Sequence, residues 1–201
     1  YDAYEPIINL HGGAAVGVPL RAKDYSIDWE LVWDAINEQT KMIIINSPHN
    51  PSGAILSQDD LKSLESIIDE TGIFLLSDEV YEHIVFDGTE HYSVLRSQRL
   101  RKNAIVISSF GKTFHATGWR IGYFIAPEQL TNEIRKVHQY NTFTIHTPTQ
   151  LALADYLQAP SHYQEIGSMY QAKRDFFLEA LHGSRFKPIP SSGTYFQLMS
   201  Y

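Results

Sequence analysis

Continuous apolar runs, separated by amphipathic stretches, constrain the fold of this chain more than any other feature of its sequence. Residues 42–45, 73–76 and 104–107 are apolar without any polar alternation, and a further apolar run follows at residues 121–126. Strands of a parallel sheet that is covered on both faces show this pattern, because neither face meets water. The sequence therefore predicts four buried strands.

Helical patterns lie between and after these runs. We expect helices at residues 28–38, 57–72, 127–138, 151–157 and 163–181, and further strands at residues 14–20, 186–190 and 195–199. Ser57 and Asp60 resemble a capping box at the start of the second helix, and Gly72 is suited to end it. The alternation predicts an α/β fold with a mostly parallel, doubly wound sheet. We assign residues 1–183 to a large domain with an interdomain helix, and 184–201 to the start of a smaller α+β domain.

Composition excludes several classes of protein. The 201 residues are 43% hydrophobic and 19% charged, as in globular domains, and the net charge of −7 without a basic run argues against nucleic-acid binding. There is no cysteine, and the nine histidines form no pair at helical spacing, so we expect no metal site. No apolar run reaches the roughly 18 residues of a membrane span, and we expect a cytoplasmic protein. The sequence begins without methionine and stops inside what the pattern predicts as a strand, so we expect a piece of a longer protein.

Polar loops follow the apolar runs and carry the residues of interest. Because the ligands of α/β sheets bind where the strands end, we expect these loops to meet at one edge. Their candidate side chains are Asn50, Asp78, Tyr81, Ser109, Lys112 and Arg120.

This set of side chains matches the needs of pyridoxal 5'-phosphate. The cofactor requires a lysine for a Schiff base and a carboxylate beside its pyridine nitrogen. It also requires donors for its phenolic oxygen, and an arginine with hydroxyl groups for its phosphate. Taken singly, Asp78 reads as a capping carboxylate, Asn50 as a turn residue and Arg120 as a surface charge. Their joint order along the chain favours the cofactor site.

The motifs resemble those of the fold-type I, class I/II pyridoxal phosphate aminotransferases. Asn50-Pro51-Ser52-Gly53 is similar to the Asn-Pro-Thr-Gly turn of that family, and residues 77–81 match its Asp-x-x-Tyr element. Residues 109–112 and 118–123 match its lysine signature. Within the family, residues 78–84 and 137–140 resemble the branch that contains bacterial methionine aminotransferases and the kynurenine and glutamine–phenylpyruvate aminotransferases.

The resemblance implies a role for each candidate residue. Lys112 is the Schiff-base lysine and moves the proton between the substrate Cα and the cofactor, while Asp78 pairs with the pyridine nitrogen. Asn50 and Tyr81 bind the phenolic oxygen. The remaining positions are the phosphate ligands Ser109 and Arg120, and Tyr1, where the family stacks an aromatic ring on the cofactor.

The expected function is transfer of an amino group from an amino acid, with methionine or an aromatic amino acid favoured, to a 2-oxo acid by a ping-pong scheme. Two alternatives stay open: a C–S β-lyase of the same fold, and an aminotransferase-like ligand-sensing domain of a transcription regulator. The family forms homodimers. It places a second phosphate loop and a partner tyrosine before Tyr1, and the substrate-carboxylate arginine beyond Tyr201. We therefore expect this stretch alone to be inactive or poorly folded.

Overall fold

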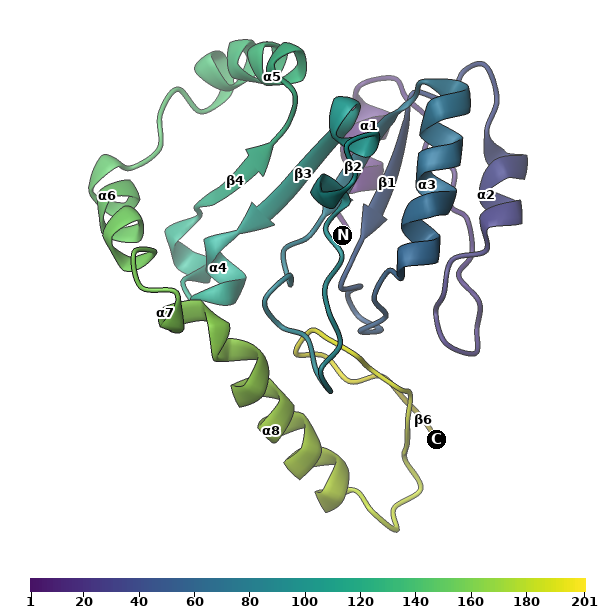
Figure 1. Ribbon diagram of the computed structural model, residues 1–201, viewed down its shortest axis with the longest axis vertical. Helices are drawn as coiled ribbons and strands as arrows, with labels where there is room; N and C mark the ends of the chain where they lie inside the picture. The colour runs from purple at the N-terminus through teal and green to yellow at the C-terminus, as the bar shows by residue number, and fades with distance from the viewer.

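The computed structural model describes all 201 residues and is built around a four-stranded sheet (Figure 1). Its strands are β1 (Met42–Asn46), β2 (Phe74–Asp78), β3 (Ala104–Ser109) and β4 (Gly122–Ile125), in the spatial order β1-β2-β3-β4. The first three run parallel, with Asn46 opposite Asp78 and Asp78 opposite Ile107. The four predicted strands and the mostly parallel sheet are confirmed, but β4 is largely exposed and the expectation that it is buried was wrong.

Strand β4 runs antiparallel to β3, with Ser109 opposite Gly122. The connection holds only the short helix α4 (Phe110–Thr113) and a 3-10 turn at Thr117–Trp119. Parallel strands need a longer crossover, so this short connection returns the chain in the opposite direction. A Cβ atom at Gly122 would lie 2.6 Å from the carbonyl oxygen of Ser108, which is why a glycine starts the returning strand.

Seven further α-helices surround the sheet. They are α1 (Tyr4–Leu10), α2 (Trp29–Ala35), α3 (Gln58–Thr71), α5 (Glu128–Asn141), α6 (Thr147–Tyr156), α7 (Ser161–Gln164) and α8 (Ile166–Ala180), and short 3-10 turns span Val94–Arg96 and Leu100–Lys102. Figure 1 shows α2 and α3 on the β1 side and α5 and α6 on the β4 side, with α8 leading away from the sheet. None of the helices combines the length and the apolar character needed to cross a bilayer.

The ends of α3 follow from its sequence. The Ser57 backbone N–H donates to Asp60 Oδ2 at 2.7 Å, and the Asp60 N–H donates to Ser57 Oγ at 3.2 Å. Gly72 ends the helix in the left-handed conformation, with φ of 68°. The predicted capping box and glycine cap are both confirmed.

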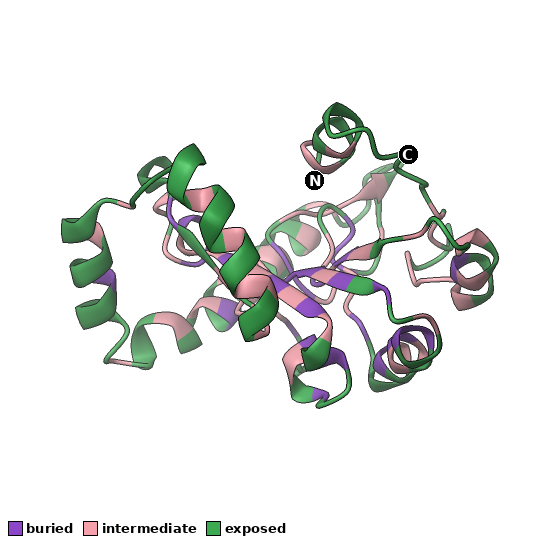
Figure 2. Ribbon diagram, turned by 90° about the horizontal axis from the view of Figure 1, so that it is seen from above, coloured by how far each residue is buried: buried purple, intermediate pink, exposed green.

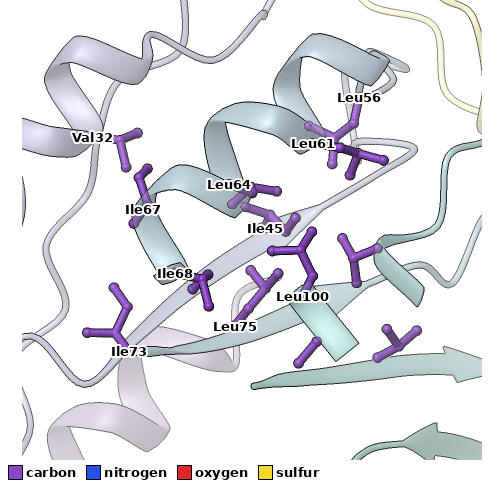
Figure 3. Close-up of a cluster of buried hydrophobic side chains, with 13 residues drawn as sticks. Val32, Ile45, Leu56, Leu61, Leu64, Ile67, Ile68, Ile73, Leu75 and Leu100 are labelled. Carbon is purple, nitrogen blue, oxygen red and sulfur yellow. The ribbon is translucent and has the colours of Figure 1, made fainter. Parts of the chain in front are cut away.

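The main core lies between α3 and the strands (Figure 3). Leu64 and Ile67 of α3 are fully buried, as is Leu75 of β2. The thirteen buried residues of this cluster are Val32, Ile45, Leu56, Leu61, Leu64, Ile67, Ile68, Ile73, Leu75, Val94, Leu100, Ala104 and Val106. Figure 2 shows that burial is concentrated in the strands and on the inner face of α3, whereas the helices after β4 are largely exposed.

Several predicted elements differ from the structure. Residues 14–20 form no strand, because no neighbouring strand supplies hydrogen bonds to them. The helix expected at 163–181 is divided into α7 and α8. Gly167, in the first turn of α8, lies so close to the loop after β2 that a Cβ there would meet the Val85 carbonyl oxygen at 3.0 Å. Helix α1 had no counterpart in the prediction. Helix α2 ends at Ala35, three residues before the expected end.

The last part of the chain folds back on the first. Its strands are short, β5 (Lys187–Pro188) paired antiparallel with β6 (Met199–Ser200). Between them, Ser192 N–H donates to the Gly53 carbonyl at 3.0 Å, and Thr194 N–H donates to the Ile84 carbonyl at 2.9 Å. The segment 191–194 is thereby fixed to the turn that follows β1 and to the loop after β2.

Candidate active site

The carboxyl ends of β1 and β2 are tied together at the edge where the site was predicted. Asn46 Nδ2 donates to the Asp78 carbonyl at 2.9 Å, and Asn46 Oδ1 accepts the Asn50 N–H at 2.8 Å. The Ser47 N–H also donates to the Asp78 carbonyl, at 3.0 Å. The turn that carries Asn50 is thus anchored directly to the residue that ends β2. Asn46 was missed by the motif analysis, although its position at the strand end was a usable signal.

The Asp78 carboxylate is buried, with 8% of the residue exposed. Oδ1 accepts the Val80 N–H at 3.2 Å, and Oδ2 accepts the hydroxyl proton of Tyr4 at 2.5 Å. Tyr4 lies at the start of α1, 74 residues away in the chain, and no motif pointed to it. Asp78 is therefore a fixed acceptor at the sheet edge.

Tyr81 and Asn50 come together as predicted. Tyr81 is 2% exposed, and the Asn50 amide and the Tyr195 side chain both interact with its hydroxyl. Burial raises the pKa of Tyr81 well above its usual range, and Tyr195 raises it further, so the hydroxyl remains a proton donor. That Asn50 and Tyr81 bind one oxygen of the cofactor stays a prediction.

Lys112 lies on α4, directly after β3, and is half-buried. The lysine–carboxylate ion pairs of the chain involve Lys62 and Lys136, so the Lys112 amine is not neutralised by a carboxylate. Ser109 caps α4, with Oγ accepting the Gly111 N–H at 3.1 Å. Helix α4 and its N-cap thus present an amine and a hydroxyl three residues apart at the end of β3.

Arg120 returns to this place because β4 pairs antiparallel with β3. It adopts a left-handed conformation with φ of 56°, and Nη1 donates to the Thr117 carbonyl at 3.1 Å. Its guanidinium forms no ion pair with Asp or Glu, and the residue is exposed. An exposed guanidinium with free donors is suited to bind an anionic group.

Tyr1 is 77% exposed and forms an edge-to-face contact with Tyr4, at 5.7 Å between ring centroids. Through Tyr4 it lies on the side of the site where Asp78 is held. The ring is free to contact a ligand, and stacking on a cofactor remains a prediction for this residue.

A second set of aromatic side chains, here called the aromatic wall, consists of His115, Tyr170, Tyr195 and Phe196. His115 Nε2 and Tyr170 Oη lie 2.6 Å apart, and the Tyr170 and Tyr195 rings lie 5.5 Å apart. Tyr195 contacts Tyr81 edge to face at 5.2 Å. The wall therefore connects the Lys112 turn, α8 and the C-terminal segment with Tyr81. No motif in the sequence pointed to Tyr195.

The donor set fits pyridoxal phosphate. A buried carboxylate suits the protonated ring nitrogen, and two converging polar side chains, Asn50 and Tyr81, suit the phenolic oxygen. An amine that pairs with no carboxylate suits a covalent bond, while a hydroxyl and a guanidinium suit the phosphate. Each group occupies the carboxyl edge of one sheet, the usual place for ligands in such folds.

Comparisons with known proteins define the class. The family described as Aminotransferase class I and II matches residues 1–201. The chain belongs to this family. It is 46% identical over 202 residues to a methionine aminotransferase of Escherichia coli K12, covering 100% of this chain and 52% of that protein. It is 38% identical over 180 residues to a kynurenine–oxoglutarate transaminase of Dictyostelium discoideum, covering 87% of this chain and 41% of that protein.

Solved structures agree with the sequence comparisons. The crystal structure of YbdL from Escherichia coli, identified as a methionine aminotransferase, matches with a TM-score of 0.97 at 46% identity, covering 100% of this chain and 53% of that one. The N-succinyldiaminopimelate aminotransferase of Mycobacterium tuberculosis matches with a TM-score of 0.92 at 33% identity, covering 97% and 52%. The chain spans about half the length of these relatives, and the fold prediction is confirmed over that length.

Proposed function

We propose that the protein of which this chain forms part is a pyridoxal phosphate-dependent aminotransferase. The observation that carries the proposal is the convergence of Asp78, the Asn50–Tyr81 pair and the Lys112 turn at one edge of the sheet. Named aminotransferases at 46% and 38% identity support it.

We further propose residues 1–183 as the large domain, 184–201 as the start of the small domain, and a cytoplasmic location.

The candidate residues bind different parts of the cofactor. Asp78 accepts a hydrogen bond from the ring nitrogen, Asn50 and Tyr81 contact the phenolic oxygen, and Ser109 with Arg120 contacts the phosphate. Tyr1 supplies a ring for stacking. When bound, the cofactor provides an electron sink that makes the proton on the substrate Cα easier to remove.

Lys112 performs the proton transfer. Its amine is the only lysine nitrogen on the loops of this edge, and it forms no ion pair with a carboxylate. Acting as a base, Nζ would accept the proton from the substrate Cα and deliver it to the bound cofactor. Burial keeps the Asp78 and Tyr81 side chains away from bulk water, which strengthens their hydrogen bonds.

For the amino donor we propose methionine or an aromatic amino acid. The aromatic wall supports this choice, since Tyr170, Tyr195 and Phe196 offer polarisable surface next to Tyr81. Thioethers and aromatic rings both make favourable contacts with such surfaces. The methionine aminotransferase of Escherichia coli supports the same assignment.

We also propose a homodimer. Apolar side chains on and after β4 are exposed, including Ile125 at 47%, Val137 at 68% and Phe143 at 76%. An apolar surface of this kind is typical of a contact with other protein. Light scattering on the full-length protein tests the assignment: a mass of two chains supports it, and a monomer at micromolar concentration contradicts it.

A panel of amino donors tests the function. The full-length protein with pyridoxal phosphate is incubated with methionine, phenylalanine, kynurenine and cystathionine, and the 2-oxo acid, the aminated acceptor and pyruvate are measured separately. We expect equal amounts of 2-oxo acid and aminated acceptor from methionine or phenylalanine. Pyruvate and ammonia from cystathionine without amino transfer would instead assign the C–S β-lyase. Cofactor binding without either reaction would favour the ligand-sensing domain.

A further inference from the structure

The Tyr4–Asp78 hydrogen bond has the features of a strong, charge-assisted contact. Tyr4 Oη lies 2.5 Å from Asp78 Oδ2, within the about 2.5–2.7 Å typical of a hydroxyl that donates to a carboxylate. Asp78 is buried and Tyr4 is half-buried, so little water competes for the bond. The second oxygen, Oδ1, accepts a longer bond of 3.2 Å from the Val80 N–H. Tyr4 is therefore the closest protein donor to this carboxylate.

The proton of this bond belongs to the tyrosine. Burial raises the pKa of the Tyr4 hydroxyl far above its usual value, and the hydrogen bond to Asp78 raises it further. The phenol thus stays protonated and Asp78 accepts. A donor that stabilises a carboxylate makes the carboxylate a weaker base, because the charged form is favoured over the protonated form.

We propose that Tyr4 is a positioning residue that fixes the orientation of the Asp78 carboxylate and lowers its basicity. The proposal rests on the proposed function, in which Asp78 faces the protonated ring nitrogen of pyridoxal phosphate. With the phenol in place, the proton between the two groups stays on the ring nitrogen. Without it, Asp78 becomes the stronger base and draws that proton toward itself.

Tyr4 also contacts Tyr1, the residue proposed to stack on the cofactor. Its ring meets Tyr1 edge to face at 5.7 Å between centroids, and both residues belong to the start of the chain. The same side chain thereby orients the ring proposed to stack on the cofactor and the carboxylate proposed to pair with it. Loss of the whole Tyr4 ring would disturb both contacts, whereas loss of the hydroxyl alone affects only Asp78.

The Tyr4→Phe variant isolates the hydroxyl. The full-length holoenzyme is prepared with pyridoxal phosphate labelled with ¹⁵N in the ring, and the ¹⁵N resonance is compared with that of the wild type. We expect the resonance to move toward the value of an unprotonated ring, and the cofactor dissociation constant of the apoprotein to rise about tenfold, as expected for one hydrogen bond to a charged group. Tyr92→Phe is the matched control, since Tyr92 Oη accepts only an exposed bond from Gln58.

A graded substitution covers the case in which Tyr4→Phe folds poorly. Replacing Tyr4 with 3-fluorotyrosine makes the phenol a stronger donor, and we expect the ¹⁵N resonance to move in the opposite direction. If Tyr4 only packs against its neighbours, the ¹⁵N resonance should stay unchanged in both variants. Unchanged ¹⁵N positions in the variants that bind cofactor overturn the proposal for Tyr4. A wild-type protein that binds no pyridoxal phosphate at all instead overturns the proposed function.

Discussion

Arg174 and Asp87 face each other through two parallel hydrogen bonds, Nη1–Oδ2 at 2.6 Å and Nη2–Oδ1 at 2.7 Å. Arg174 also donates to the Ser191 carbonyl at 3.2 Å, and its guanidinium lies 4.8 Å from the centre of the Phe86 ring. One side chain of α8 thus joins the loop after β2 to the C-terminal segment. The Arg174 side chain is 13% exposed, whereas the Asp87 side chain is 56% exposed, so the ion pair is shielded on the arginine side only.

Removing this junction will lower stability. We expect Arg174→Ala to reduce the free energy of unfolding by about 2 kcal/mol, since hydrogen bonds to charged groups and the ring contact are lost together. Urea denaturation measures the change. Arg99→Ala is the control, because the Arg99–Asp69 pair is exposed on both sides and should contribute less than about 0.5 kcal/mol. Equal effects of the two substitutions would contradict the assignment.

The contribution of Asp87 depends on pH. The hydrogen bonds from Arg174 hold the pKa of the Asp87 carboxyl below its usual value, so the folded state favours the ionised form. That stabilisation is present above the pKa of the unfolded state, about 4, and is lost as the pH falls through the lower folded pKa. We expect Asp87→Asn to be less stable than the wild type at pH 7 and nearly equal to it at pH 2.5. A difference that stays constant across this range would be evidence against the linkage.

Position 53 requires a glycine for two reasons: the segment 191–194 approaches it closely, and its backbone is in the left-handed conformation. Its φ is 75°, and a Cβ there would lie 1.9 Å from Ser191 Oγ and 2.6 Å from the Gly193 carbonyl oxygen. We expect Gly53→Ala to cost more than about 2 kcal/mol, from backbone strain and steric overlap together. Gly88→Ala provides the control, with a φ of 68° and no atom within 4 Å, and should show only about 1 kcal/mol of strain. Similar melting temperatures for both variants would show that the segment 191–194 does not pack on this turn.

Glu79 forms a buried pair with His91 behind the site. Oε2 lies 2.9 Å from His91 Nε2, while Oε1 accepts the Ser77 hydroxyl at 3.0 Å and the Val94 N–H at 3.1 Å. The residue is 1% exposed, so Glu79→Ala leaves several buried donors unpaired, and we expect a loss of roughly 3–5 kcal/mol of stability. Glu90→Ala, at an exposed pair with Arg96, should change stability by less than about 0.5 kcal/mol. Thermal unfolding of the two variants side by side measures both values, and a mild effect of Glu79→Ala would show that water replaces the pair.

The aromatic wall makes a prediction about the amino donor. Tyr195→Ala removes the ring that contacts Tyr81 and Tyr170, and we expect kcat/KM for methionine and phenylalanine to fall about tenfold, as for the loss of a modest apolar contact. Alanine as donor should be affected less, because it has no side chain to reach the wall. Tyr195→Phe keeps the ring and should retain most of the activity. A uniform loss for all donors would assign Tyr195 to support of Tyr81 rather than to selection of the donor.

Local features of the sequence were sufficient to predict the positions of the four strands and the two ends of α3. The unbroken apolar runs identified the strands, and Ser57 with Gly72 marked the two ends of the helix. The antiparallel direction of β4 was not accessible in this way, because it depends on the short path between Ser109 and Gly122. The segment 14–20 was wrongly predicted as a strand, since β-propensity does not reveal whether a partner strand is present.

The candidate site likewise contains residues that the sequence could identify and residues that it could not. Asn50, Asp78 and Lys112 lie in motifs whose chemistry is readable from residue type and spacing. Tyr4 and Tyr195 do not, because each reaches the site through a contact between distant parts of the chain. Such contacts carry no periodicity and no local signal.

Reduction with borohydride tests the central claim most directly, because it converts a lysine–cofactor Schiff base into a stable bond. The full-length protein is incubated with pyridoxal phosphate, reduced, digested and examined by mass spectrometry. We predict one modified peptide that contains Lys112, and loss of both the modification and the activity in Lys112→Ala. A reduced cofactor on another lysine, or activity that survives in Lys112→Ala, would contradict the account.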